Sequence, residues 1–84
     1  MMAKKRMRGR KLVRVKLKVK EVAESKGFTQ TKLSRQAELQ YPTVHGLWMN
    51  PYRDASINTL AKIAHALKVD IHDLYEVLPD TENE

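Results

Sequence analysis

The 84-residue chain contains no cysteine, which excludes a disulfide framework and a thiolate metal site. It has no apolar run near the roughly 20 residues of a membrane span. Its basic N-terminus also lacks the apolar stretch of a secretory signal. We therefore expect no membrane partner and a cytoplasmic location. A chain of this length forms one domain with a marginal core, so a partner subunit would help to stabilise it.

Acidic residues are missing from the first 20 positions, which hold ten lysines and arginines. Residues 21–84 hold six Lys/Arg against ten Asp/Glu, a net charge of −4, although the whole chain carries +6. The positive charge therefore belongs to one end, as in basic arms that bind nucleic acid; a solubilising tail is the alternative. Composition predicts a disordered basic arm over 1–11, a domain over 12–79 and an acidic tail over 80–84. The cations of the arm are Lys4, Lys5, Arg6, Arg8, Arg10 and Lys11.

Two short segments near the ends of the domain favour β-structure. Val13, Val15 and Leu17 alternate with basic residues, and this period of two is typical of a strand with one apolar face. A helix beginning near Val13 would instead spread these side chains around several faces. The run Tyr75–Leu78 is the second segment. Because two strands alone are only marginally stable, we expect them to pair, with Val13, Val15 and Val77 packed on the helices, or to pair their edges across a dimer.

Helix caps and stops divide the first half of the domain. Apolar spacing, together with a left-handed stop at Gly27, predicts a first helix over about Lys18–Lys26. Thr29 is a suitable N-cap for a second helix over Gln30–Ala37. After a three-residue turn, a third helix begins with Gln40 at or near its N-cap.

The second half of the domain is divided in the same way. We expect Asn50 to end the third helix in a left-handed conformation. Ser56 caps a fourth helix over Ile57–Leu67, which has the clearest helical periodicity in the chain, and Asp70 caps a short fifth helix. We expect Trp48 at the edge of the core or in an interface. The predicted core side chains are Leu33, Ala37, Val44, Leu47, Leu60, Ile63 and Leu67.

The second and third helices, joined by a three-residue turn, form a helix-turn-helix unit. The major groove of DNA is wide enough for a helix and displays a distinct pattern of donors and acceptors for each base pair. In such a unit the second helix enters that groove, and the N-terminus of the first helix can meet a phosphate. The sequence therefore predicts double-stranded DNA as the ligand.

The residues of this unit resemble the Cro and lambda-repressor type (Xre-type) of helix-turn-helix protein. The matching stretches are Phe28-Thr-Gln-Thr-Lys-Leu-Ser-Arg-Gln-Ala, Leu39-Gln-Tyr-Pro-Thr-Val-His-Gly-Leu-Trp and Ala55-Ser-Ile-Asn-Thr-Leu-Ala-Lys-Ile-Ala-His-Ala-Leu-Lys-Val-Asp-Ile-His-Asp-Leu-Tyr. The resemblance covers roughly Val19–Tyr75. It implies an all-α, lambda-repressor-like bundle of five helices, to which the periodicity adds short terminal strands. It also implies a sequence-specific transcriptional regulator that binds DNA as a homodimer.

The resemblance assigns DNA contacts residue by residue. Base contacts fall on the exposed start of the third helix, at Gln40, Tyr41, Pro42, Thr43, His45 and Gly46. Contacts to the DNA backbone fall on the second helix and on the loop after the third, at Gln30, Lys32, Arg35 and Arg53. Two positions depart from the family pattern. Glu38 stands in the turn where glycine is frequent, and Gly46 stands where a base-reading side chain is frequent.

Signals for catalysis and for metal binding are lacking. The sequence has no glycine-rich phosphate loop and no Cys/His pair, so we predict no enzyme, no cofactor and no metal. Asp70, His72 and Asp73 suggest metal ligands by their types, but helix capping accounts for both acids. Two other functions stay open: an antitoxin-like module that binds a toxin, and a non-specific nucleic-acid binder acting through the basic arm.

Overall fold

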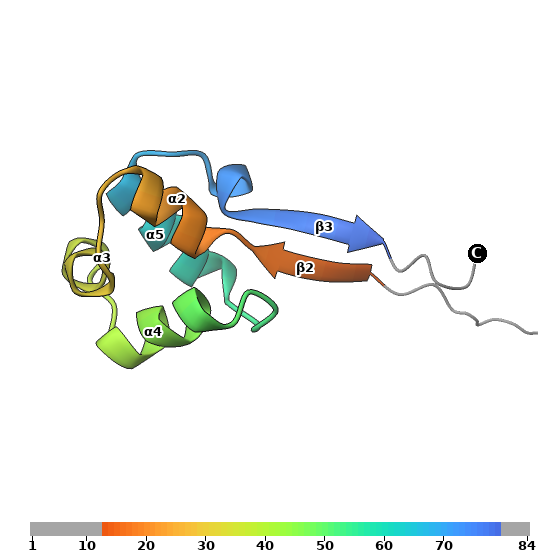
Figure 1. Ribbon diagram of the computed structural model, residues 1–84, viewed down its shortest axis with the longest axis horizontal. Coiled ribbons are helices and arrows are strands. Elements are labelled where there is room, and N and C mark those ends of the chain that lie inside the picture. Colours follow the sequence, from red (N-terminus) through yellow and green to blue (C-terminus); the bar gives the residue numbers. More distant parts are fainter. Residues whose placement is uncertain (1–12, 80–84) are drawn as a thin grey trace, which may run out of the picture.

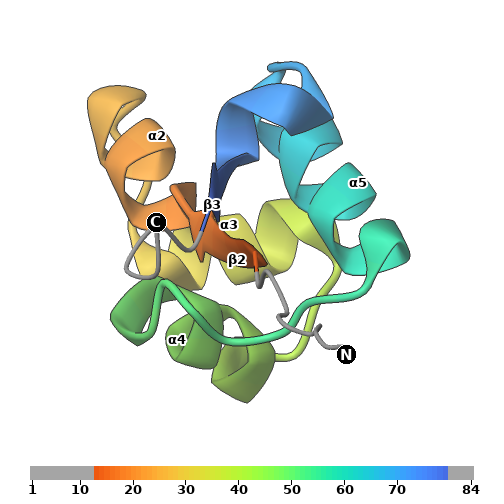
Figure 2. The ribbon, with the colours of Figure 1, turned by 90° about the vertical axis from the view of Figure 1, so that its right-hand side faces the viewer.

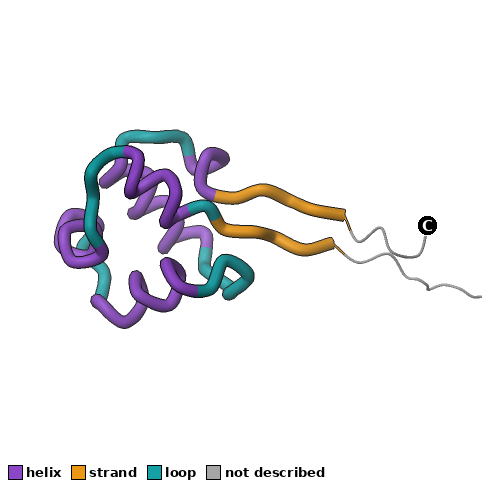
Figure 3. Tube along the Cα trace, in the orientation of Figure 1, coloured by secondary structure: helices purple, strands orange, loops and turns teal. Residues whose placement is uncertain are grey.

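A computed structural model of the chain describes residues 13–79. The predicted basic arm over 1–11 and the acidic tail over 80–84 lie outside these residues. Helices form a bundle at one end of the molecule, and two strands extend from the bundle as a ribbon (Figure 1, Figure 3). In chain order the elements are β2 (Val13–Leu17), α2 (Val19–Ser25), α3 (Gln30–Ala37), α4 (Tyr41–Met49), α5 (Ile57–Leu67), η1 (Ile71–Leu74) and β3 (Tyr75–Pro79).

Capping residues begin and end the helices where the sequence predicts. Oγ1 of Thr29 accepts a hydrogen bond from the backbone N–H of Lys32 at 3.1 Å, and α3 spans the predicted residues. Oγ of Ser56 accepts from the backbone N–H of Thr59 at 3.0 Å, and α5 also spans the predicted residues. These side chains satisfy backbone donors that have no partner inside the helix. Gly27, with a φ of +78°, follows α2 in the left-handed backbone expected of it.

Two predicted details of the helices are wrong. Asn50 ends α4 in an extended conformation, with φ −126° and ψ 99°, and its side-chain oxygen accepts from the N–H of Tyr52 at 3.0 Å. The expected fifth α-helix is η1, a 3₁₀ helix of four residues capped by Asp70. Because β3 begins at the residue after η1, the segment has no room for a longer helix. Residues 13–79 therefore form four α-helices, one 3₁₀ helix and a small sheet, and not an all-α bundle of five helices.

The two ends of the domain pair as antiparallel strands, which confirms the predicted pairing. The register joins Val13 to Pro79, Val15 to Val77 and Leu17 to Tyr75. Opposite residues of a sheet share a face, so the valines lie together on one face of the ribbon. Leu17 at the base of the ribbon is buried, but Val13, Val15 and Val77 are 65%, 45% and 56% exposed. The predicted packing of these valines on the helices is wrong, because the ribbon runs away from the bundle (Figure 1).

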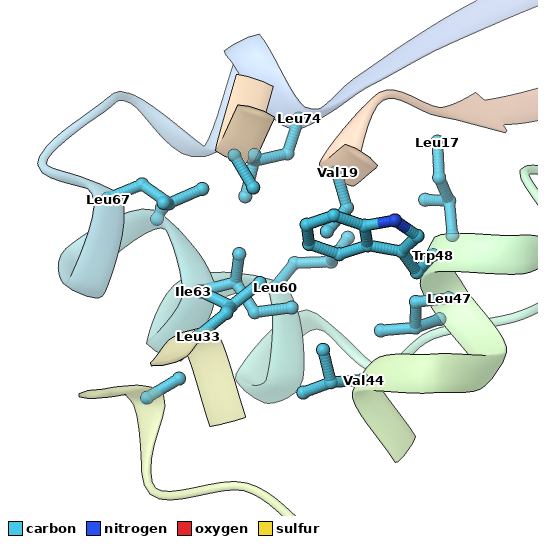
Figure 4. Close-up of a cluster of buried hydrophobic side chains, with 13 residues drawn as sticks. Leu17, Val19, Leu33, Val44, Leu47, Trp48, Leu60, Ile63, Leu67 and Leu74 are labelled. Carbon is cyan, nitrogen blue, oxygen red and sulfur yellow. The ribbon is translucent and has the colours of Figure 1, made fainter. Parts of the chain in front are cut away.

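The core lies among the four helices and is closed by η1. Figure 2 looks along the ribbon, with α2, α4 and α5 around it and α3 behind. Trp48 is predicted at the edge of the core and is buried there, beside Leu17 and Val19 (Figure 4). In the described part of the chain no helix is long and apolar enough to cross a membrane. The fully buried larger side chains are Val19, Leu33, Val44, Ile63, Leu67 and Leu74.

Candidate nucleic-acid interface

Helix α3, the turn at residues 38–40 and helix α4 form the predicted helix-turn-helix unit. Glu38 makes the turn in the left-handed conformation, with φ 57° and ψ 47°, a geometry that usually favours glycine. The backbone N–H of Leu39 donates to the carbonyl of Ser34 at 2.9 Å, and the Leu39 side chain packs against the core. The turn is therefore held by both its backbone and its side chains, and α4 has a defined orientation on α3.

Helix α4 buries one face and leaves the opposite face open. Val44, Leu47 and Trp48 are buried, whereas Tyr41 at the start of the helix is 47% exposed and Met49 at its end is 62% exposed. The predicted base-contact residues divide accordingly. Those that are exposed are Gln40, Tyr41, Pro42 and His45, and those that are half-buried are Thr43 and Gly46.

His45 links the two helices of the unit. Its Nδ1 donates to Oε1 of Gln30 at 2.8 Å, and its ring stacks on that of Tyr41, with centroids 5.8 Å apart and an interplanar angle of 22°. Because an amide oxygen only accepts, Nδ1 carries the proton of this hydrogen bond. Two predicted base-contact residues and one predicted phosphate-contact residue thus form a single cluster.

Gly46 and Arg53 lie against each other. A Cβ atom built on Gly46 would lie 2.7 Å from Nη1 and 2.9 Å from Cζ of Arg53. Real Cβ atoms do not approach other atoms so closely, so the guanidinium occupies the space that a side chain at position 46 would need. The guanidinium consequently partly covers the glycine on the solvent side of α4.

The loop that carries Arg53 is anchored at several points. The backbone N–H of Leu17, in β2, donates to the carbonyl of Pro51 at 2.6 Å. The backbone N–H of Arg53 donates to the carbonyl of Asn50 at 3.2 Å. Cζ of Arg14 lies 4.4 Å above the ring centroid of Tyr52, which ties the loop to β2 a second time. These contacts therefore hold the loop backbone in place at Arg53.

The other predicted backbone contacts lie on α3. Lys32 and Arg35 are exposed, and Nζ of Lys32 lies 4.7 Å from the ring centroid of Phe28, near the start of the helix. Neither α3 nor α4 contains an acidic residue, so these cations meet no carboxylate on the two helices of the unit. The arm residues Lys4, Lys5, Arg6, Arg8, Arg10 and Lys11 lie outside the described residues.

Asp70 and His72 act as a helix cap. Oδ1 of Asp70 accepts from the backbone N–H of His72 at 2.8 Å and from Nδ1 of the same residue at 2.7 Å. The backbone hydrogen bond, and then the side-chain one, lower the pKa of Asp70 below its usual value of 3.8. Among residues 13–79, no three His, Cys, Asp or Glu side chains gather closely enough to hold a metal ion.

Sequence reasoning missed the pairing of Gly46 with Arg53 and the cation–π contact of Arg14. Both depend on where the loop after α4 runs, and no local pattern encodes that path. The stacking of Tyr41 on His45 had a usable signal, because residues four apart are neighbours on a helix surface.

Comparison with protein families assigns most of the chain. A family model described as a Cro/C1-type helix-turn-helix DNA-binding domain matches residues 18–80, which contain the whole of α3, the turn and α4. The comparison with curated proteins gives no match. The matched region begins after β2, so the N-terminal strand lies outside it.

Proposed function

Because the chain belongs to the Cro/C1-type helix-turn-helix DNA-binding family, we propose that it is a transcriptional regulator that recognises a specific duplex sequence. In this proposal α4 enters the major groove with its outer face toward the base edges, and the N-terminus of α3 lies at a phosphate. The protein acts by binding and catalyses no reaction.

The two faces of α4 carry this proposal. Its apolar side chains Val44, Leu47 and Trp48 are used by the core, so helix packing does not require the outer face. That face has no charged side chain of its own, and at its N-terminal end it holds the Gln30–His45–Tyr41 cluster. A major-groove helix uses its N-terminal residues for base contacts, which matches the position of this cluster.

Selection of duplexes from a random pool tests this function. The full chain is incubated with the pool at fixed salt concentration, since affinity for DNA depends on salt, and the bound duplexes are sequenced over several rounds. We expect one motif to be enriched, with two related half-sites. Retention of duplexes without any enriched motif would mean that the protein binds DNA non-specifically.

The ribbon supports binding as a homodimer. Val13, Val15 and Val77 share one uncharged face of β2 and β3 that no helix covers, and a two-stranded sheet is marginal by itself. Two copies related by a two-fold axis bury this face against its own equivalent without placing like charges together. The two α4 helices then address two half-sites, whose centres are about 34–36 Å apart when one helical turn separates them.

Light scattering on the purified protein measures its oligomeric state and so tests whether it is a dimer. We expect a dimer for the wild type and a monomer for Val15→Lys, because the new charge would be buried in the interface. Ala61→Lys, which adds the same charge to an exposed position of α5, is the matched control and stays dimeric. A monomeric wild type would contradict the proposed homodimer. It would favour a different protein, such as a toxin, as the partner that covers Val13, Val15 and Val77.

A further inference from the structure

The centre of the outer face of α4 has almost no hydrogen-bonding side chain of its own. Pro42, Gly46 and Met49 follow helical spacing and lie opposite the buried Val44 and Leu47. Proline and glycine offer no side-chain donor or acceptor, and the methionine thioether is a weak acceptor. The centre of the surface that the proposed function turns toward DNA is therefore poor in groups that distinguish bases.

Arg53, in the loop after α4, supplies hydrogen-bond donors to this part of the face. Its guanidinium lies where a side chain of residue 46 would be, with Nη1, Cζ and Nε at 2.7, 2.9 and 3.2 Å from a Cβ built on Gly46. The loop backbone is hydrogen-bonded to β2 and to Asn50, so the Cα atom of Arg53, from which the side chain extends, has a defined position. A larger residue at position 46 would force the guanidinium away from α4.

The donors of this guanidinium remain available. Arg53 is exposed, and no carboxylate of the described residues lies within ion-pair distance of it. A guanidinium presents five N–H donors in a rigid fork. In the major groove, guanine offers two adjacent acceptors, O6 and N7, which such a fork meets with two parallel hydrogen bonds, whereas adenine presents a donor beside its acceptor.

We propose that Arg53 is a specificity-determining residue that selects a guanine in each half-site. Gly46, which has no side chain, leaves the space that the Arg53 guanidinium occupies. This inference rests on the proposed function, because it needs α4 to face the major groove. It differs from the expectation that Arg53 contacts only the DNA backbone. A phosphate contact carries no base information, so the two roles predict different binding data.

Selection from a random duplex pool is run on the full wild-type chain, Arg53→Ala, Gly46→Ala and Lys62→Ala. We expect the wild type to enrich a motif with a guanine that Arg53→Ala no longer prefers, with a loss of preference of about 5- to 100-fold at that position alone. Gly46→Ala is expected to lose the same preference although Arg53 is present. Lys62→Ala, which removes an exposed cation of α5 outside the helix-turn-helix unit, is the control and keeps every base preference.

A second measurement alters the DNA and compares the wild type with Arg53→Ala. Replacing the selected guanine by 7-deazaguanine removes N7 and leaves base pairing intact, so we expect weaker binding by the wild type and no further loss for Arg53→Ala. Uniform weakening by Arg53→Ala on all duplexes, with the guanine still preferred, would assign Arg53 to a phosphate and overturn the inference. An unchanged guanine preference in Gly46→Ala would overturn the claim that Gly46 positions the Arg53 side chain. In both of these outcomes a motif is still enriched, so the proposed function stands. If the wild type enriches no motif, the proposed function and the inference about Arg53 are both wrong.

Discussion

Nδ1 of His45 donates to Oε1 of Gln30 at 2.8 Å, across the two helices of the helix-turn-helix unit. Both residues are predicted to contact DNA, so the bond orders two contact side chains before DNA arrives. We expect Gln30→Ala and His45→Ala each to weaken binding to the selected duplex, with a coupling of about 0.5–1.5 kcal/mol between them. A double-mutant cycle of anisotropy titrations measures this coupling. Strictly additive losses would show that the two side chains act independently.

Gly46→Ala is expected to change stability and selectivity in opposite directions. Alanine is better in a helix than glycine by about 1 kcal/mol, and the atom that must move is the far end of the flexible Arg53 side chain. We therefore expect urea unfolding of Gly46→Ala to show a gain of up to about 1 kcal/mol. A loss of stability would mean that α4 tolerates no side chain at this position.

The N-caps of the helix-turn-helix unit are expected to differ in strength. Thr29 bonds to the backbone N–H of Lys32, whereas the side chain of Gln40 makes no capping bond at α4. Thr29→Ala should therefore cost about 1 kcal/mol of unfolding free energy. Gln40→Ala serves as the matched control and should stay within about 0.5 kcal/mol of the wild type. Equal losses in thermal unfolding would contradict this difference.

The parts of the fold that the sequence predicted depend on near neighbours. The caps at Thr29 and Ser56 act within three residues, and the bounds of α3 and α5 followed from them. The conformation of Asn50 depends on a loop that is bonded to β2 through Leu17 and Pro51, residues far apart in the sequence. Exposed fractions of the valines could not be predicted either, because alternation identifies an apolar face and does not say what covers it.

The same distinction applies to the candidate site. Helical periodicity separated the buried from the open face of α4, so most of the predicted base-contact residues are exposed. The position of the Arg53 guanidinium over Gly46 joins a loop to a helix face, and no periodic pattern reports such a contact.

Asp70 predicts a dependence of stability on pH. Hydrogen bonds from His72 hold the pKa of Asp70 below its usual value of 3.8 in the folded protein. The stabilisation by the charged form is therefore complete well above that value and is lost as pH falls through the folded-state pKa. We expect the wild type to be more stable than Asp70→Asn at pH 6, and the difference to shrink below about pH 4. A difference in urea midpoint that is constant from pH 6 to pH 2.5 would contradict this.

The basic arm is expected to add affinity without adding sequence information. A chain beginning at Lys11 lacks Lys4, Lys5, Arg6, Arg8 and Arg10, and residues 21–84 carry a net charge of −4. Each lost phosphate contact should reduce the slope of log affinity against log salt by about 0.9. We expect weaker binding to every duplex and an unchanged order of preference.

A chain beginning at Lys4, which loses three uncharged residues, is the control for this truncation and should bind like the wild type. An unchanged salt slope in the shorter chain would show that the arm does not touch DNA. A changed order of preference would show that the arm reads bases, as minor-groove arms do.

The ratio of affinities for the selected duplex and for a scrambled duplex of equal length tests the central claim most directly. It is measured at one salt concentration for the wild type, for Gln40→Ala combined with Tyr41→Ala, and for Lys62→Ala, an exposed control on α5. If the outer face of α4 reads bases, the double variant loses about tenfold or more on the selected duplex and little on the scrambled one, while Lys62→Ala matches the wild type. Equal losses on both duplexes, or no loss on either, would contradict recognition through α4.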